Sequence, residues 1–128
     1  MPIICGIDPG LSGALCFIDT SKNPLDLIAV YDMPTTPFGT KQRVNGAEVW
    51  ALLVEHEADE VWIENVWSRP GEGVSSAFSF GESFASVRTA AQITGAKVSF
   101  VTPGVWKADL KVPALKDGAR EAARVWSH

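Results

Sequence analysis

The sequence contains no hydrophobic run long enough to cross a membrane and no opening segment of the secretory type. Its apolar stretches stay well short of the ~20 residues that a membrane-spanning helix needs, and a charged residue and a turn already follow at Asp8. Cysteine is scarce, at two residues. Cys5 and Cys16 fall in the first two apolar runs, and without a secretory signal we expect reduced core thiols rather than a disulfide. These absences predict a cytoplasmic location.

Histidine is equally scarce, and the sequence has no internal repeats or low-complexity segments. His56 and His128 do not show the spacing of metal ligands. What the chain does contain is apolar surface, because 46% of its 128 residues are hydrophobic and five are tryptophan. This composition excludes a disordered chain. The length suits one folded domain over residues 1–128.

The order of apolar runs and turn residues predicts an α/β domain. Three strands come first, joined by short turns that indicate antiparallel neighbours, and a polar loop over 34–43 follows them. The predicted strands are 3–8, 13–19, 27–33, 60–64 and 97–101, and the predicted helices begin near 45, 75 and 117. This order predicts a mixed five-stranded sheet, with strands one to three antiparallel, strands four and five as parallel additions, and helices on both faces.

Residue spacing also predicts how the helices begin and which side they bury. Asn45 is the expected N-cap of the first helix, with Glu48 as its capping-box partner. The expected buried face of that helix consists of Ala47, Trp50, Leu53 and Val54. The expected buried stripe of the long helix over 75–94 consists of Ala77, Phe80, Phe84, Val87 and Ala91.

Two acidic residues end short apolar strands. Asp8 follows the run 3–7, and Glu64 follows the run 61–63. An unpaired buried charge costs several kcal/mol, so an apolar strand carries an acid only where something stabilises it. A divalent cation does so, because hard cations prefer carboxylate oxygens. The alternatives are that Asp8 caps the following turn and that Glu64 forms a salt bridge. The pair predicts the site of a divalent-metal hydrolase.

Charge is distributed unevenly along the chain. The net charge of −4 argues weakly against binding to nucleic acid. However, residues 1–64 hold ten acidic and three basic residues, for a net charge of −7, whereas residues 65–128 hold five acidic and eight basic residues, for +3. A basic flank beside an acidic metal site suits a phosphodiester substrate, although an ordinary solvated surface gives the same counts.

The predicted strand order, with acids ending strands one and four, resembles the ribonuclease H-like fold. Within it, Ile-Asp-Pro-Gly-Leu-Ser-Gly at 7–13 resembles the opening motif of the RuvC-type Holliday junction resolvases, in the phage and bacterial RuvC-like branch. Ile-Glu-Asn-Val-Trp at 63–67 is similar to their second motif. The Gly-, Ser- and Phe-rich start of the long helix and Thr-Pro-Gly-Val-Trp-Lys at 102–107 also match. The resemblance covers nearly the whole chain.

The resemblance implies a metal-dependent, structure-selective DNA endonuclease. Asp8 and Glu64 would be its catalytic residues and would ligate Mg²⁺ or Mn²⁺. The implied partner is branched DNA, a four-way junction handled in recombination and repair. Lys107 and Lys116 match backbone-contacting positions, whereas a solvated surface is the alternative for both. Trp67 matches an aromatic at the junction centre, with a core position as its alternative, and Arg69 would flank the same cleft.

The sequence departs from the family pattern at its end. RuvC-type enzymes carry further acids on the last helix, and the stretch 116–122 resembles only the part that precedes them. We therefore expect the nuclease domain to lack its C-terminal catalytic helix segment, with the third and fourth carboxylates beyond His128. Two other readings stay open: a non-catalytic RuvC-like DNA-binding protein, and an actin-like nucleotide-binding domain.

A junction resolved by two symmetric nicks calls for two active sites related by a two-fold axis, and so for a homodimer. The helix over 75–94 is the candidate dimer surface because it carries Phe78, Phe80 and Phe84, and because Ala85, Ala90 and Ala91 allow a second helix to approach closely. The alternative is that the three aromatic rings pack inside one protomer.

Overall fold

The computed structural model describes residues 2–22, 24–65 and 73–101. The strands are β1 (Ile3–Asp8), β2 (Ala14–Asp19), β3 (Asp26–Asp32), β4 (Thr35–Phe38), β5 (Lys41–Val44), β6 (Glu60–Glu64) and β7 (Lys97–Val101), and the helices are α1 (Gly46–Glu55) and α2 (Val74–Ile93). The five strands and two helices predicted within these residues are present, with bounds that differ by one residue at most. Of the described helices, none is both long and apolar enough to cross a membrane.

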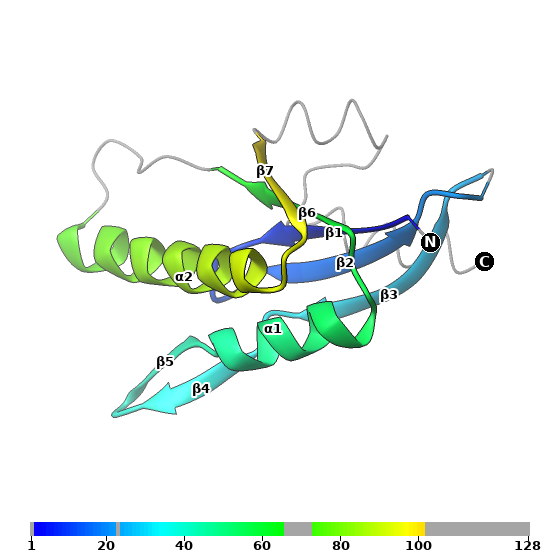
Figure 1. Cartoon of the computed structure of the whole chain (residues 1–128). Helices are drawn as coiled ribbons and strands as arrows, with labels where there is room; N and C mark the ends of the chain where they lie inside the picture. Colours follow the sequence, from blue (N-terminus) through cyan, green and yellow to red (C-terminus); the bar gives the residue numbers. More distant parts are fainter. Residues whose placement is uncertain (1, 23, 66–72, 102–128) are drawn as a thin grey trace.

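The main sheet has five strands in the order β3-β2-β1-β6-β7 (Figure 1). β1 pairs antiparallel with β2, and β2 pairs antiparallel with β3. β6 lies parallel to β1, and β7 lies parallel to β6. The predicted mixed sheet is therefore confirmed. Parallel neighbours need a crossover between them, and α1 and α2 supply the two crossovers.

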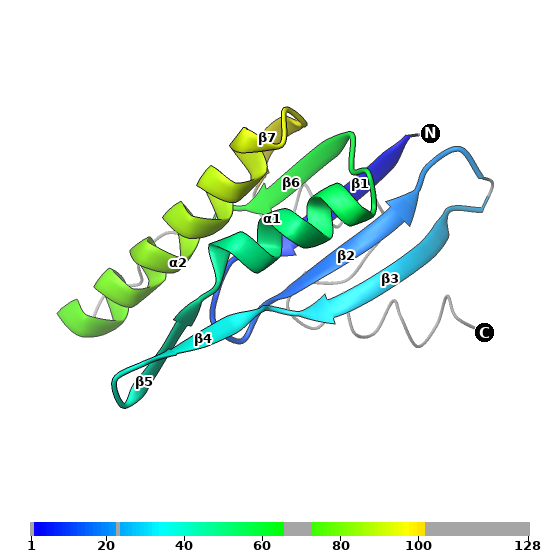
Figure 2. The ribbon, with the colours of Figure 1, turned by 60° about the horizontal axis from the view of Figure 1, so that its bottom comes forward.

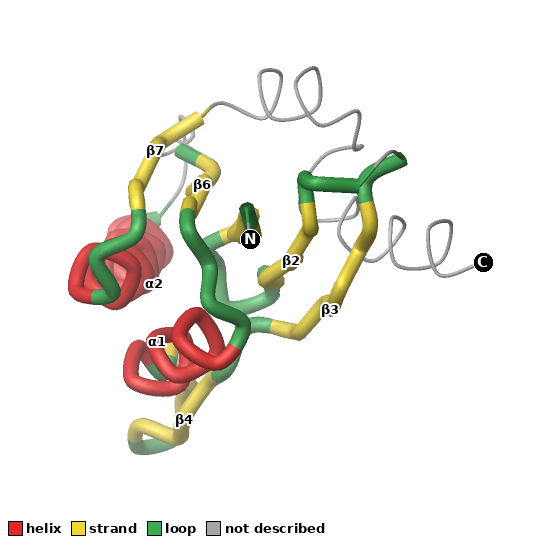
Figure 3. The backbone as a smooth tube through the Cα atoms, turned by 45° about the vertical axis from the view of Figure 1, so that its right-hand side comes forward, coloured by secondary structure: helices red, strands yellow, loops and turns green. Residues whose placement is uncertain are grey.

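Each face of the sheet has its own apolar cluster, because side chains alternate along a strand. On the helix face, strand residues such as Ile7, Phe17 and Ile63 pack with Leu53 of α1 and Val87 of α2. The other face, here called the far face, carries Ala14, Cys16 and Ile18 of β2, with Trp62 and Val101 packed against them. Both described helices lie on the helix face (Figure 3). The helix predicted after Asp117 lies outside the described residues.

The two cysteines illustrate this alternation. Cys5 belongs to the helix-face cluster and Cys16 to the far-face cluster, although their strands are direct neighbours. Side chains on opposite faces of a sheet cannot approach for a disulfide. Both thiols are free and buried, as predicted. Burial raises the pKa of the Cys16 thiol to about 12 and that of Cys5 well above its usual value.

Helix α1 begins as predicted but buries a different side. The Asn45 side chain accepts a hydrogen bond from the backbone N–H of Glu48 at 3.1 Å. The backbone N–H of Asn45 donates to the carbonyl of Pro34, so the second bond of a capping box is replaced. Val49 and Leu53 are buried, whereas Trp50 and Val54 are 42% and 47% exposed. The prediction is therefore confirmed for Leu53 and wrong for Trp50 and Val54, because apolar residues extend around more than one side of this helix.

The segment predicted as a polar loop over 34–43 is a β-hairpin. β4 pairs antiparallel with β5 from Thr35↔Val44 to Phe38↔Lys41. Gly39, at a φ of 62°, provides the left-handed residue that a tight hairpin turn requires. Pro37 is tolerated because β4 belongs to a two-stranded ribbon rather than to the interior of a sheet. Figure 2 shows this hairpin extending away from the main sheet.

Candidate metal centre on the far face

Asp8 is the last residue of β1 and is followed by a tight turn. Its Oδ1 accepts a hydrogen bond from the backbone N–H of Gly10 at 3.3 Å, and the N–H of Gly13 donates to the carbonyl of Gly10 at 2.9 Å. A Cβ added to Gly13 would lie 2.0 Å from the carbonyl oxygen of Asp8, so this position requires glycine. The turn-capping alternative for Asp8 is therefore correct in part.

Glu64 is the last residue of β6, which lies directly beside β1. Ile7 is in register with Ile63, so one further step along these parallel strands puts Asp8 beside Glu64. Aligned residues of parallel neighbours point to the same face, and adjacent strands lie about 4.8 Å apart. Ile7 and Ile63 face the helices, so both carboxylates point to the far face. The structure thus brings together two predicted site residues that are distant in sequence.

Both carboxylates are largely withdrawn from solvent, with 8% of Asp8 and 6% of Glu64 exposed. Each takes part in interactions within the structure. Two buried like charges on adjacent strands repel each other strongly, since burial weakens solvent screening. A hard divalent cation bound by both would relieve this repulsion. In charge and donor type, the pair therefore fits Mg²⁺ or Mn²⁺.

A third acid lies in the same row of the sheet. Ala14 of β2 pairs with Asp8 on one side and with Asp32 of β3 on the other, so Asp32 also belongs to the far face. Two strand spacings, about 10 Å, separate Asp32 from Asp8, and Asp32 is exposed. In the described part of the chain, no three His, Cys, Asp or Glu residues are close enough to hold one ion. Asp32 was not among the site residues predicted from the sequence, although it too ends a strand.

The acids stand beside apolar neighbours. Ala14 and Cys16 of β2, Trp62 of β6 and Val101 of β7 belong to the far face around the Asp8–Glu64 pair. The indole N–H of Trp62 donates to the side chain of Glu60, which satisfies the polar edge of that ring. An apolar surround lowers the local dielectric constant and strengthens any interaction between the carboxylates and a cation. The other predicted site residues, Trp67, Arg69, Lys107 and Lys116, lie outside the described residues.

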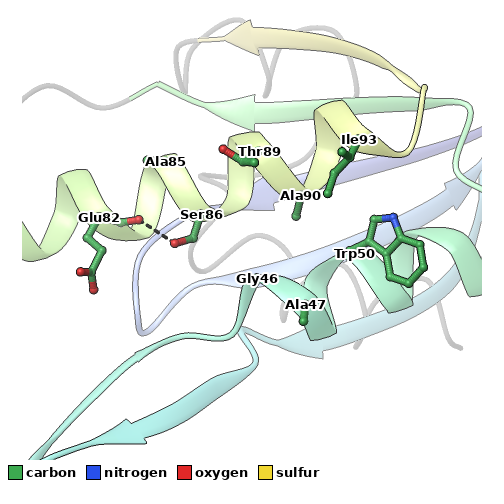
Figure 4. A pocket seen from close by; sticks show the side chains of 9 residues that line it. All are labelled: Gly46, Ala47, Trp50, Glu82, Ala85, Ser86, Thr89, Ala90 and Ile93. Carbon is green, nitrogen blue, oxygen red and sulfur yellow. Dashed lines mark hydrogen bonds between the residues drawn. The ribbon is translucent and has the colours of Figure 1, made fainter.

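A second surface feature lies on the helix side of the molecule. A groove of about 620 Å³ runs between α1 and α2. Small residues make up most of its walls, Trp50 and Ile93 lie toward one end, and Glu82 lies toward the other (Figure 4). Ile93 is 68% exposed. The groove is on the opposite side of the sheet from Asp8 and Glu64, so the two features are separate.

The chain resembles known proteins in its fold rather than in its sequence. No family model matches the sequence. No curated protein sequence matches it either. Among solved structures, RuvC from Thermus thermophilus in complex with a Holliday junction substrate superimposes with a TM-score of 0.69 at 19% identity, over 99% of this chain and 80% of that one. A second structure of Thermus thermophilus RuvC gives a TM-score of 0.60 at 20% identity, over 97% of this chain and 76% of that one. The chain therefore has the α/β, ribonuclease H-like fold of the RuvC-type resolvases.

Proposed function

We propose that this protein is a metal-dependent, structure-selective DNA endonuclease that hydrolyses phosphodiester bonds in branched DNA. The observation that carries the proposal is the pairing of Asp8 and Glu64, two buried carboxylates at matching positions on adjacent parallel strands. A divalent cation is the counter-charge that suits such a pair, because hard cations prefer carboxylate oxygens. The fold shared with a RuvC that was solved with a Holliday junction substrate supports the choice of substrate.

In this proposal, Asp8 and Glu64 hold Mg²⁺ or Mn²⁺, which when bound supplies Lewis-acid stabilisation and a nucleophilic water for phosphodiester hydrolysis. The residues of this chain hold the two carboxylates in position. The backbone N–H of Gly10 orients the Asp8 carboxylate, and strand pairing fixes both main chains. The apolar neighbours exclude bulk water from the carboxylates.

The predicted DNA contacts complete the proposal. Lys107 and Lys116 act as point charges on the DNA backbone, Trp67 stacks on a base at the junction centre, and Arg69 flanks the same cleft. Their sequence pattern supports these roles, and mutagenesis of each tests them. The proposed reaction suits DNA recombination and repair.

We also propose that the protein acts as a C2 homodimer built on α2. Residues at spacings of three and four line its outer stripe, defined here as Phe78, Glu82, Ala85, Thr89 and Ile93. Phe78 is 73% exposed, whereas Phe84 packs against Phe80 and Phe100. Of the three aromatic residues considered from sequence, Phe78 is thus the one best placed for a partner.

The outer stripe is self-complementary for antiparallel packing. Phe78 and Ile93 lie equally far from the midpoint between Ala85 and Ser86, about 11 Å along the helix in each direction. A two-fold axis at this midpoint therefore puts each Phe78 opposite the partner's Ile93, beside the groove that Trp50 lines. Small side chains at the midpoint let the helices approach closely. This packing also pairs two active sites for two symmetric nicks.

The second candidate is a RuvC-like protein that binds branched DNA without cutting it. The observation in its favour is that the described residues bring together two acids but no third ligand. One experiment separates the candidates. The full-length protein is incubated with a labelled four-way junction and with linear duplex of the same sequence, with Mg²⁺, with Mn²⁺ or with EDTA.

The endonuclease proposal requires paired nicks in the junction that depend on the metal and are much weaker in linear duplex. Binding without nicks under all three conditions would establish the non-catalytic alternative instead. The actin-like alternative requires ATP binding, which a parallel equilibrium binding measurement with labelled ATP tests directly.

A further inference from the structure

The β4–β5 hairpin is a local concentration of positive charge in an acidic half of the chain. Two of the three basic residues among positions 1–64, Lys41 and Arg43, lie in it. The stretch 33–45 contains no acidic residue, whereas the rest of residues 1–64 carries all ten. The exposed Thr40 and Gln42 add side chains of the types that contact phosphate. This composition complements a polyanion.

Contacts with the rest of the protein also hold the hairpin in place. Such contacts are needed because an isolated two-stranded hairpin is only marginally stable in water. The guanidinium of Arg43 lies 3.5 Å from the centre of the Phe38 ring, and its Nη2 lies 3.4 Å from Oε2 of Glu82 on α2. At the base, Val44 is buried. Arg43 is therefore fixed across the hairpin, with 39% of its side chain still exposed, while Lys41 remains exposed at the end of the hairpin.

The position of the hairpin relates it to the Asp8–Glu64 pair. β3 ends at Asp32, in the same row of the sheet as Asp8, and β4 begins three residues later. The hairpin then projects past this end of the sheet (Figures 1 and 2). The step from Asp32 to Phe38 spans about 20 Å at most, and Asp32 lies about 10 Å from Asp8. Together these distances are less than one helical turn of duplex DNA, which is about 34 Å.

We propose that the β4–β5 hairpin is a second DNA contact, at which Lys41 and Arg43 bind the phosphodiester backbone of one duplex arm. The inference rests on the proposed function for the identity of the substrate, but the contact does not depend on cleavage. Lys41 acts as a mobile point charge, whereas the stacked Arg43 presents a fixed guanidinium edge. The contact recognises the backbone and so carries no base sequence preference.

The test measures binding rather than cutting. The affinity of the full-length protein for a fluorescent four-way junction is determined by anisotropy in EDTA, across salt concentrations, for the wild type and Lys41→Gln. Loss of one phosphate contact should reduce the slope of log affinity against log salt by about 0.9. Between 50 and 200 mM salt, the fall in affinity should then be smaller by a factor of about 3.5.

Lys22→Gln is the matched control. Lys22 is an exposed lysine, 59% accessible and paired with Asp26, in the turn between β2 and β3 at the other end of the sheet. The Lys22→Gln substitution should leave the slope of log affinity against log salt unchanged.

The outcomes separate the two proposals. A wild-type protein that binds no DNA would overturn the proposed function together with the hairpin contact. A wild-type protein that binds and cuts the junction, while Lys41→Gln matches it in affinity and salt slope, would overturn the hairpin contact alone. A loss of slope in Lys22→Gln equal to that in Lys41→Gln would show a diffuse charge effect and would also overturn the contact.

Discussion

Gly13 lies so close to Asp8 that a single added carbon has no room. The ideal Cβ position at Gly13 is 2.0 Å from the carbonyl oxygen of Asp8, and these two residues flank the tight turn that follows β1. Because the obstacle is main chain rather than a flexible side chain, only a backbone shift relieves the clash. Such a shift displaces the residue that carries the proposed metal ligand.

We therefore predict that Gly13→Ala destabilises the protein by about 1–3 kcal/mol, the usual cost of overpacking. Gly10→Ala is the matched control in the same turn, since its nearest neighbour would lie 3.8 Å away, in ordinary contact. Urea unfolding followed by tryptophan fluorescence measures both. Equal free energies of unfolding for the two variants would contradict the close approach.

Asp8→Asn and Glu64→Gln should each abolish junction cleavage and leave junction binding intact or tighter. A neutral amide is a poor ligand for Mg²⁺ or Mn²⁺, and it also removes a charge that repels phosphate. The matched control is Asp19→Asn, another acid at a strand end, which lies at the opposite end of the sheet. Gel assays of cleavage and anisotropy of binding distinguish the effects. Wild-type cleavage by either variant would rule out metal catalysis at this pair.

Asp19 itself gives a prediction about pH. The Ser21 hydroxyl, followed by the Ser21 backbone N–H, donates to the Asp19 carboxylate and lowers its pKa. A carboxyl whose pKa is lower in the folded state contributes stability above its unfolded pKa, and this contribution disappears as pH falls through the folded value. Between pH 6 and about pH 3, wild type should lose more stability than Asp19→Asn. The free energy of unfolding is measured for both proteins across this pH range. An equal loss of stability in the two proteins would contradict the hydrogen bonds from Ser21.

Phe78→Glu should convert the proposed dimer to a monomer without lowering the stability of the protomer. Phe78 is 73% exposed, so its replacement costs little inside one chain but places two charges in an antiparallel α2 interface. Ile28→Glu, at a position 42% exposed on the edge strand β3, is the control and should remain dimeric. Analytical ultracentrifugation at micromolar concentration measures both. A wild-type monomer, with and without junction DNA, would overturn the assembly.

The strands themselves and the acids at their ends could be predicted because both depend on local patterns. A short apolar run that ends on a carboxylate marks Asp8 and Glu64, and short turns between sequential strands indicate the antiparallel neighbours β1, β2 and β3. The same pattern also occurs at Asp19, where a serine two residues later satisfies the carboxylate. Local sequence therefore locates strand-end acids, whereas the neighbouring strand determines which of them form a pair.

The errors have physical causes as well. Helix α1 has Trp50 and Val54 beside Val49 and Leu53, and periodicity alone does not select between overlapping apolar faces. The hairpin was missed because two prolines and a run of polar residues obscure the alternation in β4. Its stability comes from Arg43, through contacts to Phe38 and to Glu82 in a distant helix. Long-range contacts of this kind leave no trace in a short window of sequence.

The parallel pairing of β1 with β6 has a consequence for how the protein matures. In an antiparallel hairpin such as β1–β2, partners meet soon after they are synthesised, whereas β6 reaches β1 only after β2, β3, the hairpin and α1 lie between them. The entropy of closing such a long loop makes this a slow, late contact. Asp8 and Glu64 therefore meet only when most of the domain is in place. A nascent or partly unfolded chain holds two separate acids rather than a pair, so the proposed metal site arises together with the native sheet.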